Sequence, residues 1–239
     1  MKIESLKSEL RTVADHHRAL ALQRYFKTGP GEYAEGDVFL GIRVPVLRRL
    51  AKKYVGLTLN DTVRLLRSRA HEERLTALLI LIGKYRTTDM AGKKKIYDIY
   101  LNNTGYINNW DLVDVTAKHI VGDYLSDKSR SVLYDLARSP SLWERRISIL
   151  STACFIEHGD FADTLKISRM LLDDEHDLIH KAVGWMLREV GKRDIAVEEQ
   201  FLKKHYRDMP RTALRYAIEK FPESRRKAML DLPGNGRQK

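Results

Sequence analysis

Asp114 and Trp110 are the residues whose types and spacing most clearly suggest chemistry. They lie four positions apart in NNWDLVDVTAKHIVGDYL, so in a helix both side chains point to one face. A carboxylate in such a place could stabilise positive charge or orient a water molecule. The same spacing puts Asp114 four residues before Lys118, which is typical of a surface ion pair. Spacing alone leaves both interpretations of Asp114 open.

Two further motifs match known binding-site patterns only in part. His176 and His180 in HDLIH share the spacing of the zinc-binding HExxH pattern, but the middle acid is Asp and a third ligand is not obvious. The segment GPGEYAEG at 29–36 is rich in glycine but contains neither GKS nor GKT and follows no strand. We therefore expect no metal and no cofactor, and we interpret residues 29–36 as a flexible connection.

The elements that position these residues are predicted to be helices. Apolar residues recur at spacings of three and four, and strand-like alternation is not sustained anywhere. Glycine and proline fall at intervals that end helices and do not form a linker between domains. The sequence predicts an all-α protein with one domain over residues 1–230 and a flexible C-terminal tail over residues 231–239.

An internal repeat links several of these helices. Helical segments that open on a basic residue begin at Arg74, Arg146, Lys181 and Arg211, and Trp110 lies midway between the first two. The resulting spacings of 36, 36, 35 and 30 residues are typical of two-helix units that stack on one another. We expect a curved stack of helix pairs.

Equivalent positions in stacked repeats form columns on one surface, which curvature turns into a concave binding face. The first column contains Arg74, Trp110, Arg146, Lys181 and Arg211. One helical turn further, the second column contains Leu78, Asp114, Leu150, Trp185 and Arg215. Two tryptophans and a carboxylate among cations are expected in a groove that follows a phosphate backbone. The alternative is that some of these side chains pack between the repeats.

The composition favours an anionic partner. The 43 Lys and Arg exceed the 32 Asp and Glu, which gives a formal net charge of +11 and favours nucleic acid over an acidic membrane surface. Greater solubility is the other explanation of this charge. The single Cys154 excludes an internal disulfide, and the longest apolar run, residues 75–83, is shorter than the ~20 residues of a membrane span. We expect a cytoplasmic monomer without membrane association.

Four blocks in a fixed order carry a resemblance to a known family. They are RYFK with FLGIRVPVLRRLAKK, then NNWDLVD, then LWERRISIL, then KAVGWMLREVGK. With these blocks the sequence resembles the bacterial DNA glycosylases of the AlkD type, which are built from HEAT-like repeats and remove alkylated purines. The resemblance implies a right-handed solenoid of HEAT-like helix pairs, an α-α superhelix. The sequence departs from the family pattern in KTGPGEYAEGDV, which is longer and richer in glycine.

The resemblance also implies roles for individual residues. Asp114 would be the catalytic residue, and Trp110, Trp185 and Tyr25 would contact the lesion. Arg146 would hold a phosphate, and the columns add Lys181, Arg211, Arg215 and Arg74 as further phosphate contacts. The implied reaction is hydrolysis of the N-glycosidic bond of N3- or N7-alkylated, cationic purines in duplex DNA, without enclosing the base. The protein would then be associated with the nucleoid when bound to DNA.

Two other functions fit the same features. One is a catalytically silent protein of the same fold that recognises DNA structure by shape. The other is a solenoid scaffold for an acidic protein partner. Retention of Asp114, Trp110 and Trp185 favours the enzyme.

Overall fold

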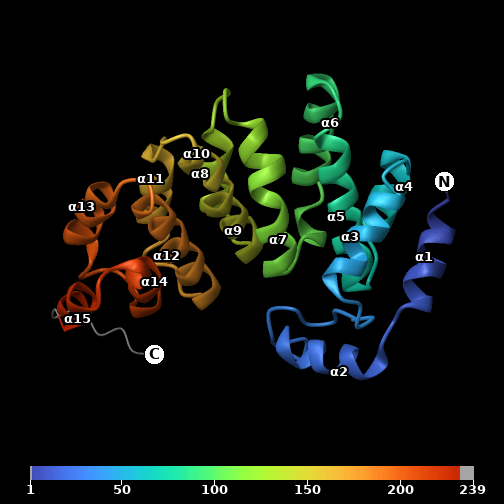
Figure 1. Cartoon of the computed structure of the whole chain (residues 1–239), viewed down its shortest axis with the longest axis horizontal. Coiled ribbons are helices and arrows are strands. Elements are labelled where there is room, and N and C mark those ends of the chain that lie inside the picture. Colours follow the sequence, from blue (N-terminus) through green and yellow to red (C-terminus); the bar gives the residue numbers. More distant parts are fainter. Residues whose placement is uncertain (1, 232–239) are drawn as a thin grey trace. The chain divides into compact units, whose positions relative to one another are not determined.

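Figure 1 shows the computed structural model, which describes residues 2–231. Every regular element in that range is a helix, apart from an isolated parallel β-bridge between Val38 and Ala70. The prediction of an all-α protein is confirmed. Contacts divide the chain into two compact units, with the division between Thr116 and Ala117. The predicted boundaries of a single domain stay a prediction, and residues 232–239 of the predicted tail lie outside the described residues.

The first unit is formed by seven α-helices and a short 3-10 helix within the described residues up to Thr116. Their bounds are α1 Ile3–Thr12, α2 His16–Tyr25, α3 Val44–Lys53, α4 Leu59–Leu66, α5 His71–Tyr85, α6 Met90–Leu101, η1 Thr104–Tyr106 and α7 Trp110–Ala117. Helices α3, α4 and α6 all pack on α5. The apolar run of α5 is the centre of this core, with Leu78, Ile80 and Leu81 completely buried. No helix within residues 2–231 combines the length and apolar character that a membrane span requires.

Local sequence explains where several of these helices begin. The Asp15 carboxylate accepts a hydrogen bond from the Arg18 N–H (3.0 Å) at the start of α2. Thr58 and Asp89 accept from the backbone N–H three residues later in α4 and α6. Such caps satisfy donors that a first helical turn leaves unpaired.

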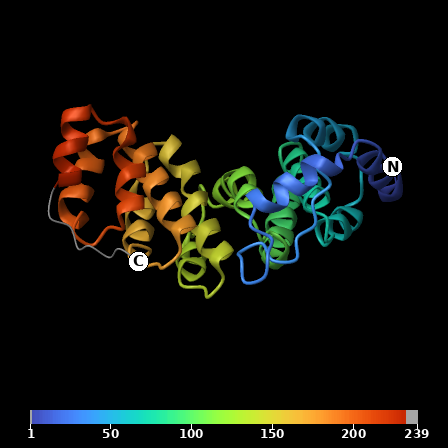
Figure 2. The same cartoon turned by 90° about the horizontal axis from the view of Figure 1, so that it is seen from below.

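Helix α2 lies crosswise to the upright helices of its unit in Figure 1, and Figure 2 views the unit from the side of α2. Its first turn rests on the segment before α3, because the Asp15 N–H donates to the Leu40 carbonyl (2.9 Å). Gly41 has a φ of 80°, and a Cβ there would overlap the Asp15 carbonyl oxygen. Only glycine therefore lets the chain pass under α2 so closely.

The second unit continues from Ala117. Its elements are η2 Lys118–Gly122, α8 Ser131–Ala137, α9 Leu142–Ser151, α10 Ala153–Glu157, α11 Ala162–Met170, α12 Asp177–Gly191, α13 Ile195–His205, α14 Arg211–Ala217, η3 Ile218–Lys220 and α15 Glu223–Asp231. The first of them, η2, is a short π-helix. Helices α9, α13 and α14 pack on α12, as Figure 1 shows. A Cβ at Gly184 would overlap the Ala213 carbonyl oxygen, so glycine permits the close approach of α12 and α14.

A buried carboxyl group lies between α12 and α13. Glu198 is 2% exposed, and its Oε1 has no hydrogen-bond partner within residues 2–231. Burial, with the nearby charge of Glu199, raises the pKa of Glu198 to about 8. The folded protein therefore holds this proton more tightly than the unfolded chain, whose glutamate has an ordinary pKa near 4.5.

This difference predicts a pH-dependent stability. Because the pKa is raised on folding, the contribution of Glu198 to stability is fully present below its ordinary pKa and is lost as the pH rises to about 8. Glu198→Gln should therefore become more stable than the parent protein between pH 5 and pH 9, by roughly 2 to 5 kcal/mol. Urea denaturation across this range measures the difference. The exposed Glu223→Gln variant is the control, and parallel pH curves for Glu198→Gln and the parent protein would contradict the prediction.

Candidate active site

The N-terminus of α7 presents Trp110 and Asp114 one turn apart on the same helix. Trp110 is the first residue of α7, and its backbone N–H donates to Oδ1 of the completely buried Asn109 (2.8 Å). Both Trp110 and Asp114 are half-buried. The charge of Asp114 also acts on α6, where it adds to burial in raising the pKa of Tyr100. Lys118, which sequence spacing suggested as an ion-pair partner of Asp114, pairs with Glu157.

Trp110 is held in an aromatic cluster, which we define as Tyr25, Phe26, Phe39 and Trp110. Its indole stacks on Phe26 with ring centroids 5.1 Å apart and planes 14° apart. Phe26 stacks in turn on Phe39 at 4.9 Å. Tyr25 meets the indole edge-on at 6.1 Å and is 65% exposed. The structure therefore brings the predicted lesion contacts Tyr25 and Trp110 into direct contact. Phe26 and Phe39, which sequence reasoning did not single out, complete the cluster.

The glycine-rich segment before α3 also reaches Trp110. Its turns are closed by hydrogen bonds from Gly29 N–H to Glu32 (2.8 Å) and from Gly31 N–H to Glu35 (2.9 Å). Burial raises the pKa of Tyr33, and a hydrogen bond with Trp110 acts in the opposite direction. The segment interpreted as a flexible connection thus supplies a polar contact to the indole.

A buried polar network lies next to the aromatic cluster, at the start of α5. The Arg74 guanidinium donates to Asp37 (2.6 Å), and His71 lies 2.8 Å from an Asp111 oxygen. The Glu72 carboxylate accepts from the backbone N–H groups of the loop, including those of Leu40 (2.8 Å) and Gly41 (2.7 Å). These residues connect the start of α5 to the loop before α3 and to α7. Sequence reasoning did not single out this network, although the charged run HEER at 71–74 could have indicated it.

Two residues predicted to contact phosphates are buried in the structure. Arg74 is 3% exposed and ion-paired with Asp37, and Arg146 is 4% exposed and donates to the Leu178 carbonyl. A phosphate contact needs an accessible guanidinium, so the structure does not support this role for either residue. Leu78 and Leu150 of the second column are buried as well. The expected columns therefore do not form continuous surfaces.

In the second unit, α12 and α14 carry the other predicted site residues. Trp185 is half-buried on α12, and its indole N–H donates to Glu189 (3.1 Å). Lys181, one turn earlier, forms an ion pair with Asp177 (2.7 Å). Arg211 and Arg215 are exposed on α14, and Arg211 donates to the Leu230 carbonyl (2.8 Å). These cations differ from Arg74 and Arg146 in being accessible to an anionic partner.

The histidines of HDLIH have structural roles. The His176 ring accepts from the Leu178 N–H (3.1 Å) and caps α12, and the His180 ring bonds the Asp174 carbonyl (2.5 Å). Residues 2–231 contain no group of three or more His, Cys, Asp or Glu side chains arranged to hold a metal ion.

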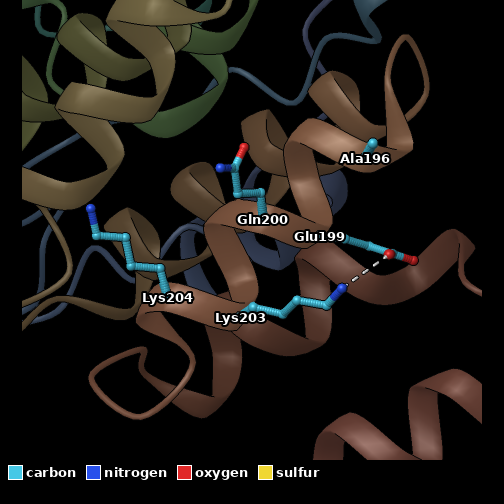
Figure 3. Close-up of a pocket in the computed structure, with 5 residues that line it drawn as sticks. All are labelled: Ala196, Glu199, Gln200, Lys203 and Lys204. Atoms are coloured by element: carbon cyan, nitrogen blue, oxygen red, sulfur yellow. Dashed lines mark ion pairs between the residues drawn. The ribbon is translucent and has the colours of Figure 1, made fainter.

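An open hollow of about 500 Å³ lies along α13 (Figure 3). It is lined by Ala196, Glu199, Gln200, Lys203 and Lys204. Lys203 and Glu199 pair across it at 3.8 Å. Its lining residues all come from α13 and include none of the predicted site residues.

Comparisons with known proteins agree with this fold. Residues 6–221 match the model of a family described as DNA alkylation repair enzyme. The chain belongs to this family. A search of curated proteins finds no match. Among solved structures, the chain is similar to a predicted DNA alkylation repair enzyme from Enterococcus faecalis, with 17% identity, a TM-score of 0.69 and coverage of 88% of this chain and 97% of the other.

A second solved structure supports the fold further. AlkD2 from Streptococcus mutans is 14% identical, with a TM-score of 0.54, and the match covers 93% of this chain and 100% of that one. At these identities the likeness concerns the fold alone. The expected HEAT-like, AlkD-type fold is confirmed.

The burial of Arg74 predicts a structural role that can be tested against the original expectation. Arg74→Met should remove the guanidinium that pairs with the buried Asp37 and leave His71 as its remaining cationic neighbour, which costs about 3 to 5 kcal/mol of unfolding free energy. Arg215→Met should change stability by no more than about 0.5 kcal/mol, because its side chain is exposed. Urea unfolding of both variants measures this. A stable Arg74→Met protein with weakened DNA binding would restore Arg74 as a phosphate contact.

Proposed function

We propose that this member of the DNA alkylation repair enzyme family is a DNA glycosylase. Its substrate would be a cationic purine alkylated at N3 or N7 in duplex DNA, and its reaction hydrolysis of the N-glycosidic bond. The observation that carries the proposal is that the half-buried Asp114 lies on α7 one turn after Trp110, whose indole is fixed in the aromatic cluster. Family membership supports a DNA-repair reaction.

The chemistry of the lesion fits these side chains. Alkylation gives the base a positive charge, so the base can depart with the electron pair of the C1′–N bond without first being protonated. The sugar then becomes electron-poor and resembles an oxocarbenium ion, which a nearby carboxylate stabilises electrostatically. Asp114 is proposed to supply this carboxylate and to orient the water that adds to C1′ and loses a proton.

Aromatic faces are proposed to bind the cationic nucleotide. Trp110 and Trp185 offer electron-rich indoles, each worth roughly 0.5 to 2 kcal/mol for a cation over the ring. Tyr25 extends the aromatic cluster toward solvent, since it is 65% exposed. The role of Trp185 follows from the family resemblance. Lys181, Arg211 and Arg215 are proposed to contact phosphates, while Arg74 and Arg146 are left out because they are buried.

Base release tests the catalytic role of Asp114. Asp114→Asn keeps the size of the side chain and removes its charge, so release of 7-methylguanine from methylated duplex should fall by roughly a hundredfold or more. Binding to a duplex with an abasic site should survive. Asp98→Asn, which removes an exposed carboxylate from α6, is the matched control. Equal loss of release and binding would indicate a folding role for Asp114, and parent protein without base release would favour the silent DNA-structure binder.

Salt dependence tests the proposed phosphate contacts. Each contact releases counterions, so the logarithm of affinity falls against the logarithm of salt with a slope of about 0.9 per phosphate. Replacing both Arg211 and Arg215 with Ala should weaken binding to plain duplex and reduce the slope by about 2. Replacing both Lys220 and Lys227 with Ala, which also removes two exposed positive charges, controls for net charge. Binding with no salt dependence would instead support the protein scaffold.

A further inference from the structure

His71 is a buried histidine next to the residues of the proposed site. It is the first residue of α5 and is almost completely buried. Its Nε2 lies 2.8 Å from an Asp111 oxygen at the start of α7. Its Nδ1 lies 3.5 Å from Asp37, in the loop before α3. One imidazole thus bridges carboxylates from two segments that are distant in sequence.

The faces of the same ring join the aromatic cluster. The imidazole stacks on Phe39 with ring centroids 4.4 Å apart and planes 20° apart, and it meets Phe26 at 5.2 Å in a tilted arrangement. Phe26 also stacks on Trp110, with ring centroids 5.1 Å apart. His71 and Trp110 are therefore connected both through Phe26 and through the chain bond between Trp110 and Asp111.

The charges around His71 favour the imidazolium. Asp37 faces it from the loop, Asp111 from α7 and Arg74 from its own helix, while Phe26 and Phe39 contribute only apolar faces. With His71 protonated, the carboxylates of the buried Asp37 and the half-buried Asp111 are balanced by two cations. Burial alone would lower the pKa of His71, but Asp111 and Asp37 outweigh this effect and raise it. The same contacts lower the pKa of Asp37 against the effect of burial.

We propose that His71 is a positioning residue for Trp110, which as an imidazolium holds the first turn of α7 against the loop containing Asp37. The indole face that binds the lesion is then fixed by a charge placed behind the aromatic cluster. The catalytic consequence rests on the proposed function, but the positioning of Trp110 does not.

This role predicts a dependence on alkaline pH. Because the His71 pKa is raised above its ordinary value of 6.5, the contribution of its charge is fully present below about pH 6.5 and is lost as the pH rises through the raised value. Neutral His71 would leave two carboxylates against one guanidinium, and the contact with Asp111 would weaken. The environment of Trp110 should change at that step.

Fluorine NMR of the full-length protein labelled with 5-fluorotryptophan tests the positioning directly. Single Trp→Phe variants assign the three resonances, and spectra are recorded from about pH 6 to pH 9. We expect the Trp110 resonance to move in one step above about pH 6.5. The step should be absent in His71→Gln and shifted to lower pH in Asp111→Asn. The exposed His17→Gln variant should reproduce the parent protein.

Two results would overturn the proposal. One is a Trp110 resonance that does not respond to pH in the parent protein, and the other is a step that persists in His71→Gln. If His71→Gln does not fold, Asp111→Asn decides, since an unmoved step in that variant also contradicts the proposal.

A base-release assay tests whether His71 affects catalysis. His71→Gln should lower release of 7-methylguanine by roughly tenfold, because a misplaced contact to the reacting centre is costly, and should remove the alkaline decline in rate. Binding to plain duplex should not change. If the parent protein releases no base, the proposed function fails, while the NMR titration still tests the positioning role.

Discussion

The buried ion pair between Asp37 and Arg74 is the contact on which the site-bearing part of the first unit depends. It ties the loop before α3 to the first turn of α5 (2.6 Å), and Glu72 reinforces the tie by accepting three backbone N–H groups of residues 40–42. The same loop carries Phe39 and, through the contact between Leu40 and Asp15, the start of α2. A buried pair adds little net stability compared with apolar packing, but breaking it is costly. Its effect is to specify one arrangement of Tyr25, Phe26 and Trp110.

The sequence predicted the helices that carry the site better than the directions of their side chains. The all-α class, the HEAT-like fold and the helices holding Asp114, Trp185 and Arg215 all follow from periodicity and the family blocks. Tyr25 contacts Trp110, and the lesion contacts that the resemblance implied for these two residues stay a prediction. Long-range partners such as Phe39 and Asp37 could not be found in this way, because no local pattern reports which loop will reach which helix.

The failure of the columns has a geometric cause. A repeat length identifies corresponding helices, but each residue turns about 100° around a helix axis, so a shift of a few positions changes the face. Trp110 is the first residue of α7, whereas Arg74 is the fourth of α5 and Arg146 the fifth of α9. Residues placed in one column therefore differ in burial, since the two arginines are buried within their units and Trp110 is half-buried.

The net charge of +11 disfavours binding of a cationic base, and the N-terminus of α7 provides negative charge locally. A basic protein attracts the phosphates of DNA but repels a cationic base, so recognition of an alkylated purine needs a local reversal of sign. Asp111 and Asp114 lie on successive turns of α7, and the half-buried indole of Trp110 at the first position of this helix offers an electron-rich face. Asp111 is occupied by His71, so its charge is balanced within the fold. In the proposed function, the charge of Asp114 is assigned to the lesion, and Asp111 holds the start of α7 against His71.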